Sequence, residues 1–487
     1  MPKKGRRKGR HSILIRGKGK SNSMKALFPL LLLLLFSAGV FSEGIRPESV
    51  KNADLNIRVV ASGSISGEVS DGDSMEVRML TFAETPAQKI GSISERLFFG
   101  ESVFAPSSYR ENPSGGNKVA VFLVDDLSGQ DKTFRVVVEA NVRASSSLEL
   151  PSGNLENDEG LSEYLGASAY MESDDPEIAD FAESNFSGDV SLEIVRAAAE
   201  WVYRNIEYDY DYYPLRNSAK ETFDLRKGVC DEFANLTGAF LRARGIPVRY
   251  VTGISFDGER FGNHGWIEAF TGNGWVGVDS TYGEAGYLDA SHVSLSKDAD
   301  ANEAVVVSLS TSSLKALSAE LTLHEPQVTV NSMDVFENVL LAEIVKPEKV
   351  APGEAFGVGV MLENTLGGDV IIPVKLALYD SFPLDPDGSE RLVWLREGEK
   401  RLVEWRTIAP GELLDGYAEY DMALFLPDRV ERGKIAVHKP EREIVLDGGE
   451  GVLFEGVANT DLLIGLGAVS ALLVCVLVLK SFLGRKS

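Results

Sequence analysis

Apolar and polar residues alternate along two long parts of the chain. Roughly residues 50–150 carry several runs with a period of two, and the pattern returns over residues 325–445. Such alternation, interrupted by Gly, Pro, Asp and Ser, is typical of strands that bury one face of a sheet. We therefore expect two β-sandwich domains, at 44–155 and at 325–446, the second of them immunoglobulin-like.

The spacing of apolar residues becomes helical between these two parts. One apolar face runs through residues 192–206, and a second helical run extends from Cys230 to Arg244. The second run is predicted to stop at Gly245, because glycine readily adopts the left-handed conformation that ends many helices. Strands follow these helices, so residues 156–310 are predicted to form an α+β domain.

Two of the predicted strands, His264 to Phe270 and Trp275 to Asp279, are separated by Thr271-Gly272-Asn273-Gly274. An Asn-Gly sequence between strands is a strong signal for a hairpin. If the hairpin closes symmetrically over Gly272-Asn273, Asp279 lies opposite Trp266 and becomes the diagonal neighbour of His264. The side chains of Asp279 and His264 are then on one face of the sheet and within reach of each other.

Both ends of the chain carry an uncharged apolar stretch. The first lies between Lys25 and Glu43 and predicts a signal peptide or an uncleaved signal anchor. The second runs from Leu462 to Leu479 and is long enough to cross a bilayer as a helix. Basic residues follow it, which predicts a single-pass protein of the cell membrane with most of the chain outside the cytoplasm. The expected segments are a basic extension with the signal at 1–43, a linker at 447–460, a transmembrane helix at 461–480 and a cytoplasmic tail at 481–487.

Charge is distributed unevenly along the chain. The formal net charge is −24, although residues 1–23 contain nine Lys and Arg and no acidic residue. The remainder is therefore strongly acidic and repels nucleic acids, so no nucleic-acid partner is expected. Contact with the membrane is expected through the C-terminal helix.

The chain has two cysteines, Cys230 and Cys475, and the second lies in the apolar C-terminal stretch. They are not expected to pair, and no multi-cysteine metal or iron–sulfur site is predicted. No cofactor is predicted either. Cys230 is the candidate nucleophile, because it begins a predicted helix whose N-terminal amides and dipole favour a thiolate. His264 is the candidate base, and Asp279 would orient its ring as in catalytic triads.

Three blocks of sequence around these residues resemble the transglutaminase-like superfamily. The blocks are Lys227-Gly228-Val229-Cys230-Asp231-Glu232-Phe233-Ala234, His264-Gly265-Trp266-Ile267-Glu268 and Trp275-Val276-Gly277-Val278-Asp279-Ser280-Thr281. The resemblance covers about residues 160–290 and implies a papain-like core, in which Cys230, His264 and Asp279 are the catalytic triad. Ser280 departs from the family pattern, because many members have proline after the aspartate.

This resemblance implies a cell-surface thiol enzyme that acts on amide bonds of proteins or peptides through an acyl-thioester on Cys230. Hydrolysis and transfer to an amine share this intermediate, so the residues leave both reactions open. A different function is that of a non-catalytic adhesion or scaffold module built on the same core. The intact set of Cys230, His264 and Asp279 argues against that alternative.

Overall fold

The computed structural model describes residues 46–439 of the 487-residue chain, apart from gaps at 113–116, 129–131, 152–159, 189, 214, 302–303, 312–315, 385–387 and 414–415. The predicted signal segment at 1–43, the linker at 447–460, the transmembrane helix at 461–480 and the tail at 481–487 lie outside the described residues. Across the described part of the chain, no helix combines the length and the apolar character needed to cross a bilayer.

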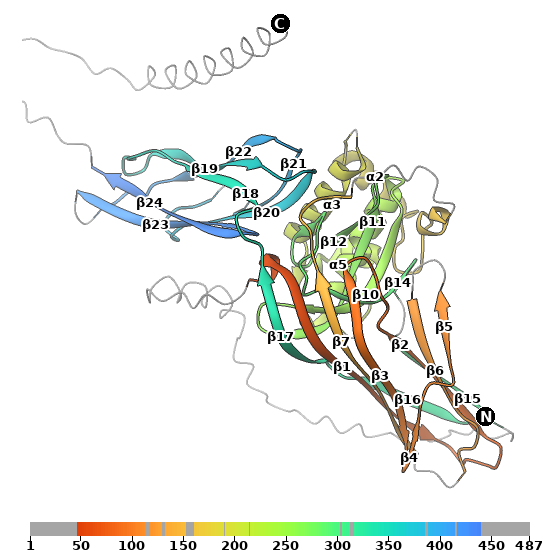
Figure 1. The fold of residues 1–487 in the computed structure, drawn as a ribbon. Coiled ribbons are helices and arrows are strands. Elements are labelled where there is room, and N and C mark those ends of the chain that lie inside the picture. The colour runs from red at the N-terminus through yellow and green to blue at the C-terminus, as the bar shows by residue number, and fades with distance from the viewer. Residues whose placement is uncertain are drawn as a thin grey trace, which may run out of the picture. The chain divides into compact units, whose positions relative to one another are not determined.

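Two antiparallel sheets form the N-terminal part of the protein (Figure 1). The larger sheet has the strand order β16-β1-β7-β3-β4, and β17 also pairs with β1. Its strands are β1 (Val50–Ser66), β3 (Gln88–Phe99), β4 (Ser102–Phe104), β7 (Thr133–Ser145), β16 (Ser318–Leu323) and β17 (Gln327–Val335). The smaller sheet has the order β15-β2-β6-β5, with strands β2 (Ser74–Thr81), β5 (Ser108–Asn112), β6 (Asn117–Val124) and β15 (Val305–Ser310).

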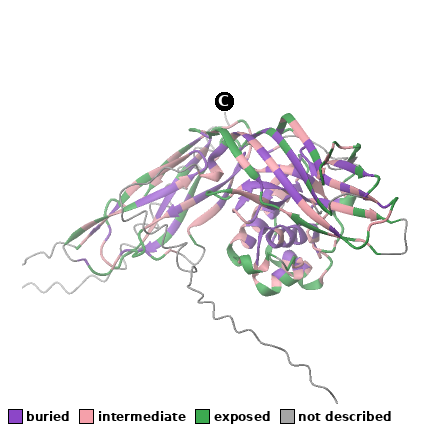
Figure 2. Cartoon of the chain, turned by 90° about the horizontal axis from the view of Figure 1, so that it is seen from below, coloured by how far each residue is buried: buried purple, intermediate pink, exposed green. Residues whose placement is uncertain are grey.

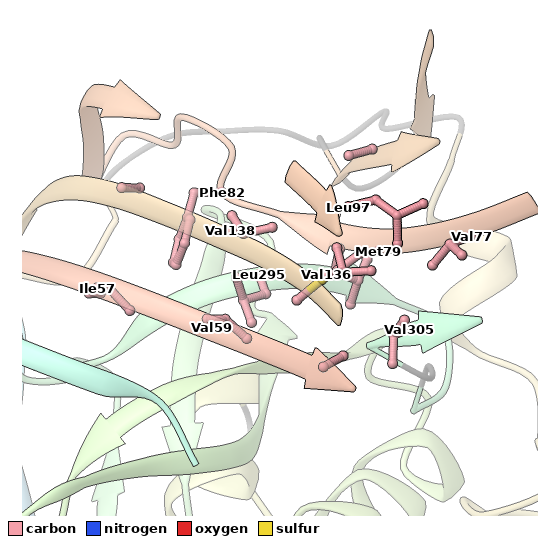
Figure 3. Close-up of a cluster of buried hydrophobic side chains, with 14 of the residues drawn as sticks. Ile57, Val59, Val77, Met79, Phe82, Leu97, Val136, Val138, Leu295 and Val305 are labelled. Carbon is pink, nitrogen blue, oxygen red and sulfur yellow. The ribbon is translucent and has the colours of Figure 1, made fainter. Parts of the chain in front are cut away.

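Alternation of apolar and polar residues gives these strands one inward face. On β7 buried and exposed positions alternate almost residue by residue, and Figure 2 shows the same alternation of colours along several strands. The inward residues of the two sheets share one hydrophobic core. Figure 3 shows this core, with Val59 and Val136 from the larger sheet and Val77 and Met79 from the smaller one.

Both sheets are completed by strands that follow the α+β part, which differs from the domain boundaries expected at 310 and 325. The strand β15 pairs with β2, and β16 and β17 pair with successive halves of β1. Val305 of β15 enters the N-terminal core (Figure 3). The physical reason is that the free edges of β1 and β2 present backbone N–H and C=O groups that need partners. Alternation of apolar and polar residues indicates that a segment is a strand, but it does not predict with which strand that segment will pair.

The α+β part contains helices followed by a five-stranded antiparallel sheet of order β13-β12-β11-β10-β14. The helices are α2 (Pro176–Asn185), α3 (Ser191–Asn205), α4 (Ala219–Leu225) and α5 (Cys230–Ala243). The strands are β10 (Val248–Phe256), β11 (Phe261–Phe270), β12 (Trp275–Asp279), β13 (Glu284–Ala285) and β14 (Val293–Asp298). A short parallel pair, β8 (Glu207–Tyr208) with β9 (Lys227–Gly228), precedes α5.

The central helix of this part is α5. It begins at Cys230, as predicted, and Gly245 just beyond its end has a φ of +74°. Nearly all of its residues are buried, including Phe233, Leu236 and Phe240. A helix that is apolar around most of its circumference becomes buried on all sides. The N-terminus of α5 is therefore held rigidly, and Cys230 with it.

The C-terminal part of the described chain forms two further antiparallel sheets. One has the order β18-β19-β22, with β18 (Leu340–Val345), β19 (Ala355–Asn364) and β22 (Lys400–Ile408). The other has the order β21-β20-β23-β24, with β20 (Val370–Ala377), β21 (Glu390–Leu395), β23 (Tyr417–Leu426) and β24 (Arg429–His438). Both contribute to one hydrophobic core that includes the fully buried Trp405.

Candidate active site

Cys230 is the first residue of α5 and directly follows β9 and Val229. The carboxylate of Glu232 accepts hydrogen bonds from the backbone N–H groups of Val229 and Asn217, at 2.9 and 2.8 Å. Gly228 leaves room for Glu232, because a Cβ atom at position 228 would lie 2.4 Å from the Cβ of Glu232. These contacts hold the backbone in front of the candidate nucleophile in one position.

The thiol of Cys230 is almost fully buried beside a carboxylate. It donates to Oδ1 of Asp231 at 3.6 Å, and the same oxygen accepts the hydroxyl of Tyr250 at 2.6 Å. Burial raises the pKa of the Cys230 thiol well above its ordinary value, the charge of Asp231 raises it further, and a hydrogen bond from the Gly265 backbone opposes both. This differs from the expectation that the helix N-terminus favours a thiolate. A thiol with a raised pKa needs a base to remove its proton before it can act as a nucleophile.

The imidazole of His264 lies beside Asp279. His264 belongs to β11, and its Nε2 is 2.7 Å from Oδ2 of Asp279, the last residue of β12. Their side chains are 5% and 1% exposed. Because an ionised carboxylate only accepts hydrogen bonds, Nε2 of His264 donates and Nδ1 is left to accept a proton. The ring of Tyr282 stacks on His264 with 4.8 Å between centroids and 8° between planes, which holds the imidazole in place.

Asp279 remains ionised although it is buried. Burial alone would raise its pKa, but the imidazole of His264, which attracts the carboxylate when it takes up a proton and donates a hydrogen bond in either state, and the imidazole of His292 lower the pKa of Asp279 below its ordinary value. Its other oxygen, Oδ1, accepts the backbone N–H of Thr281 at 2.8 Å. The carboxylate is therefore charged and oriented toward His264 at neutral pH, as the orienting acid of a triad must be.

The hairpin of β11 and β12 brings the imidazole and the carboxylate together. Its register is the predicted one, with Ile267 opposite Val278 and Phe270 opposite Trp275. The turn is closed by a hydrogen bond from the Thr271 N–H to the carbonyl of Gly274, at 3.0 Å. Since side chains alternate between the two faces of a strand, this register places the side chains of the base and the acid on one face.

One cavity of about 200 Å³ is lined by both Cys230 and His264, together with Asp231, Asn235 and Tyr250. The three residues expected from the sequence thus meet in one place, with Asp279 behind the imidazole. A larger cleft of about 510 Å³ beside α3 contains none of them. Chemistry rather than volume identifies the smaller cavity as the candidate site.

Residues 182–280 match the family model of the transglutaminase-like superfamily, and this range contains Cys230, His264 and Asp279. These residues form a transglutaminase-like domain. A 98-residue stretch is 35% identical to an uncharacterized protein of Mycobacterium leprae (strain TN), covering 18% of this chain and 34% of that relative. The chain therefore spans about a third of the length of the curated relative that it matches.

Solved structures that are similar to this protein include two described as proteases. One is a candidate cysteine protease from Cytophaga hutchinsonii, with 22% identity, a TM-score of 0.43, and coverage of 58% of this chain and 93% of that chain. The other is a candidate protease from Parabacteroides distasonis, with 12% identity, a TM-score of 0.21, and coverage of 52% of this chain and 49% of that chain.

Ser280, the departure from the family pattern, has a partner inside the transglutaminase-like domain. Its hydroxyl lies 2.7 Å from the hydroxyl of Thr237 on α5, and both side chains are buried. A buried hydroxyl with a hydrogen-bond partner costs little stability. The substitution therefore adds a polar link between α5 and the end of β12 and leaves Asp279 in position.

Sequence reasoning missed three polar residues at this site. Asp231 and Tyr250 share a hydrogen bond beside the thiol, and Nε2 of His292 lies 3.1 Å from Oδ2 of Asp279. Asp231 is adjacent to Cys230 in sequence, but adjacency does not show that its side chain turns back to the sulfur. His292 lies beyond the matched range 182–280 and is brought in by the connection between β13 and β14, for which no local pattern provides a signal.

Two buried groups of side chains bring together atoms of the kinds that bind metals. They are His264, Asp279 and His292, and Glu284, Asp289 and His292. Nε2 of His264 and both ring nitrogens of His292 already face carboxylate oxygens at 2.7 to 3.1 Å. We therefore attribute these contacts to a chain of hydrogen-bonded ion pairs and assign no metal to them.

Proposed function

We propose that the transglutaminase-like domain is a thiol enzyme that cleaves amide bonds of proteins or peptides, with Cys230 as the nucleophile. The observation that carries this proposal is the buried imidazole of His264, which is paired with Asp279 and lines the same cavity as the thiol of Cys230. Because the resting thiol holds its proton, catalysis depends on the free nitrogen of His264.

The proposed reaction starts when the Cys230 sulfur attacks the carbonyl carbon of an amide and its proton moves to Nδ1 of His264. A sulfur–carbon bond forms, and the carbonyl oxygen takes the negative charge. We assign the backbone N–H of Cys230, at the start of α5, as a donor to this oxyanion. The carbon–nitrogen bond then breaks, the amine leaves with the proton from His264, and an acyl-thioester remains on the sulfur.

The second half of the reaction depends on which acceptor reaches the thioester. Water gives a carboxylic acid and therefore hydrolysis, whereas a primary amine gives a new amide and therefore transfer. In both cases His264 takes a proton from the acceptor and the thiol is restored. The same residues serve both reactions, so the choice of acceptor has to be measured.

We test the activity with the full-length chain, purified in detergent, and a Cys230→Ala variant. Each is incubated with a mixture of proteins and a labelled primary amine, and the products are identified by mass spectrometry. Amine incorporation that depends on Cys230 identifies a transferase, and new peptide termini without incorporation identify a protease. A Cys475→Ala variant is the matched control and should keep full activity. If the Cys230→Ala variant and the parent give identical products, the scaffold function replaces this proposal.

We further propose that the transglutaminase-like domain faces the outside of the cell on a single-pass membrane protein. Support comes from the apolar stretch Leu462 to Leu479 and the basic residues Lys480, Arg485 and Lys486 that follow it. Protease added to intact cells should digest the region 46–439 and spare an epitope attached at the C-terminus. Digestion that begins only after lysis would contradict this orientation.

A further inference from the structure

A second histidine lies behind the acid of the proposed triad. His292 immediately precedes β14, and its side chain is 3% exposed. Its Nε2 is 3.1 Å from Oδ2 of Asp279, and its Nδ1 is 3.1 Å from Oδ2 of Asp289. Since Nε2 of His264 reaches the same oxygen of Asp279 at 2.7 Å, this oxygen lies between two imidazole rings.

These contacts define the charge of His292. Nε2 is hydrogen-bonded to the carboxylate of Asp279, and Nδ1 to the backbone carbonyl of Asp289 at 3.3 Å, with the charged carboxylate of Asp289 beside it. Both partners are acceptors, and a neutral imidazole has one N–H to donate, so the ring can serve both only as an imidazolium. Burial alone would lower the pKa of His292, but the charge of Asp289 and the hydrogen bonds to Asp279 and Asp289 raise it well above its ordinary value. His292 is therefore a buried cation at neutral pH.

The other groups that face His292 are consistent with this charge. Burial and the charge of Asp289 raise the pKa of Glu284 on β13 well above its ordinary value, and Glu284 accepts the Asp289 N–H at 3.1 Å. Three aromatic rings also lie beside His292, with the centroid of Trp266 at 5.1 Å, of His264 at 5.9 Å and of Tyr282 at 6.0 Å. The positive ring of His292 thus stands between the charges of Asp279 and Asp289.

We propose that His292 is a positioning residue for the thiol chemistry, holding Asp279 in the orientation that it presents to His264. This inference rests on the proposed function. Three donors fix the carboxylate of Asp279, namely the rings of His264 and His292 on Oδ2 and the Thr281 N–H on Oδ1. Without His292, Oδ2 loses one of its two donors, and the chain of contacts that links Asp279 to Asp289 is broken.

The charge of His292 also acts on the thiol at longer range. The negative charge of Asp279 is one of the causes that raise the pKa of Cys230, and a cation in contact with Asp279 offsets that charge. Removing the cation should therefore make the thiolate harder to form. The pH at which Cys230 becomes reactive therefore tests the role of His292. A purely structural role of His292 would leave this pH unchanged.

The test uses the full-length chain with Cys475→Ser, so that Cys230 is the single thiol. The rate of alkylation of Cys230 by iodoacetamide is measured from pH 6 to about pH 12, so that a raised inflection is covered, for the parent and for three variants, His292→Gln, His292→Ala and His264→Ala. Glutamine keeps an N–H donor without the charge, and alanine removes both. His438→Gln on β24 is the matched control, and thermal unfolding shows which variants are folded.

We expect His292→Gln to move the inflection upward by about one pH unit, because the charge that offsets Asp279 is gone. His292→Ala should show the same upward shift and also lower the limiting rate, about tenfold, and His292→Gln should recover part of that loss. The His438→Gln profile should superimpose on that of the parent. Added EDTA should change none of the profiles.

Three results would overturn the inference. If His292→Gln follows the parent while His264→Ala does not, the triad stands and His292 is not a positioning residue. If His264→Ala also follows the parent, the proposed function fails together with the inference. A parent profile that changes on addition of EDTA would show that a metal occupies the cluster, and the imidazolium described above would then be wrong.

Discussion

The candidate site has one aspartate beside the thiol of Cys230 and another beside the imidazole of His264. These two carboxylates have opposite effects on the reactivity of the site. On the thiol side, Asp231 accepts hydrogen bonds from the hydroxyl of Tyr250 and from the thiol, and its charge raises the pKa of Cys230. On the imidazole side, Asp279 contacts two imidazoles, and its own pKa is lowered. One carboxylate keeps the nucleophile protonated, and the other keeps the base oriented.

The contrast between Asp231 and Asp279 bears on how the proposed reaction would start. Burial and the charge of Asp231 raise the pKa of Cys230, so the thiolate is not favoured before the substrate reacts. Nucleophilic attack and proton transfer to His264 are therefore expected to proceed together. The hydrogen bond to Asp279 orients the imidazole of His264 for this proton transfer. We therefore expect a change at Asp279 mainly to reduce the rate, and a change at Asp231 mainly to move the pH at which Cys230 becomes reactive.

The largest effect is expected from Asp279→Asn. An amide cannot replace the ionised acceptor, so Nε2 of His264 loses its orienting partner and the wrong tautomer becomes available. We expect Cys230-dependent product formation to fall by about 10³–10⁴-fold, as for removal of the acid from other triads. Product formation by Asp279→Asn is compared with that by Asp180→Asn, which removes a carboxylate on the exposed face of α2. A rate within threefold of the parent would remove Asp279 from the mechanism.

His292→Gln is expected to reduce stability in a pH-dependent way. The pKa of folded His292 lies above the unfolded value of 6.5, so the stability that it contributes is fully present below pH 6.5 and is lost as the pH rises through the folded pKa. Loss of hydrogen bonds to charged groups costs about 1.5–3 kcal/mol of unfolding free energy. Denaturant unfolding at pH 5.5 and pH 9 should therefore show a larger difference between parent and variant at pH 5.5. An equal difference at both pH values would mean that the ring is not charged in the folded state.

Gly228→Ala tests how the backbone in front of the thiol is held. The new Cβ would lie 2.4 Å from the Cβ of Glu232, so Glu232 must move away from the N–H groups of Val229 and Asn217. Overpacking of this kind costs about 1–3 kcal/mol, which is read from chemical denaturation. Gly272→Ala provides a contrast, because space is open around Gly272 and its cost comes from a φ of +87° instead. If Gly228→Ala is as stable as the parent, the contact with Glu232 does not position the thiol.

The smallest effect is expected from Asp231→Asn, on the thiol side. Burial and then the charge of Asp231 raise the pKa of Cys230, so the neutral variant should alkylate with an inflection at lower pH, by about one unit. The iodoacetamide profile on the Cys475→Ser background measures this shift, and Asp180→Asn again serves as the control. A shift in the opposite direction would show that Asp231 assists removal of the proton.

Much of the candidate site could be predicted because its parts are local. The start of α5 at Cys230 follows from the apolar helical run, and the register of β11 and β12 follows from the turn at Gly272. A hairpin register depends on a few neighbouring residues, so Asp279 and His264 are paired by short-range geometry. The expectation of a thiolate at Cys230 rested on the helix N-terminus alone, and it left out burial and the charge of Asp231, which raise the pKa of the thiol.

Contacts between distant segments could not be predicted in the same way. The strands β15 to β17 look like any other alternating strands, and only the folded N-terminal sheets show which edges they complete. His292 reaches Asp279 because β14 is paired with β10, which carries the residue before it to the back of the site. Neither outcome is encoded in spacing along the chain.

The transglutaminase-like domain, the order of its helices and strands, and the candidates Cys230, His264 and Asp279 could all be found from the amino-acid sequence without a structure. Periodicity, turn residues and family motifs each depend on a few neighbouring residues, so they can be recognised without a structure. Only folding shows which strands complete the N-terminal sheets, which groups raise the pKa of Cys230 and which histidine lies behind Asp279. These properties depend on burial and on charges brought close by folding, and electrostatic interactions in a buried site depend on distance in space rather than along the chain.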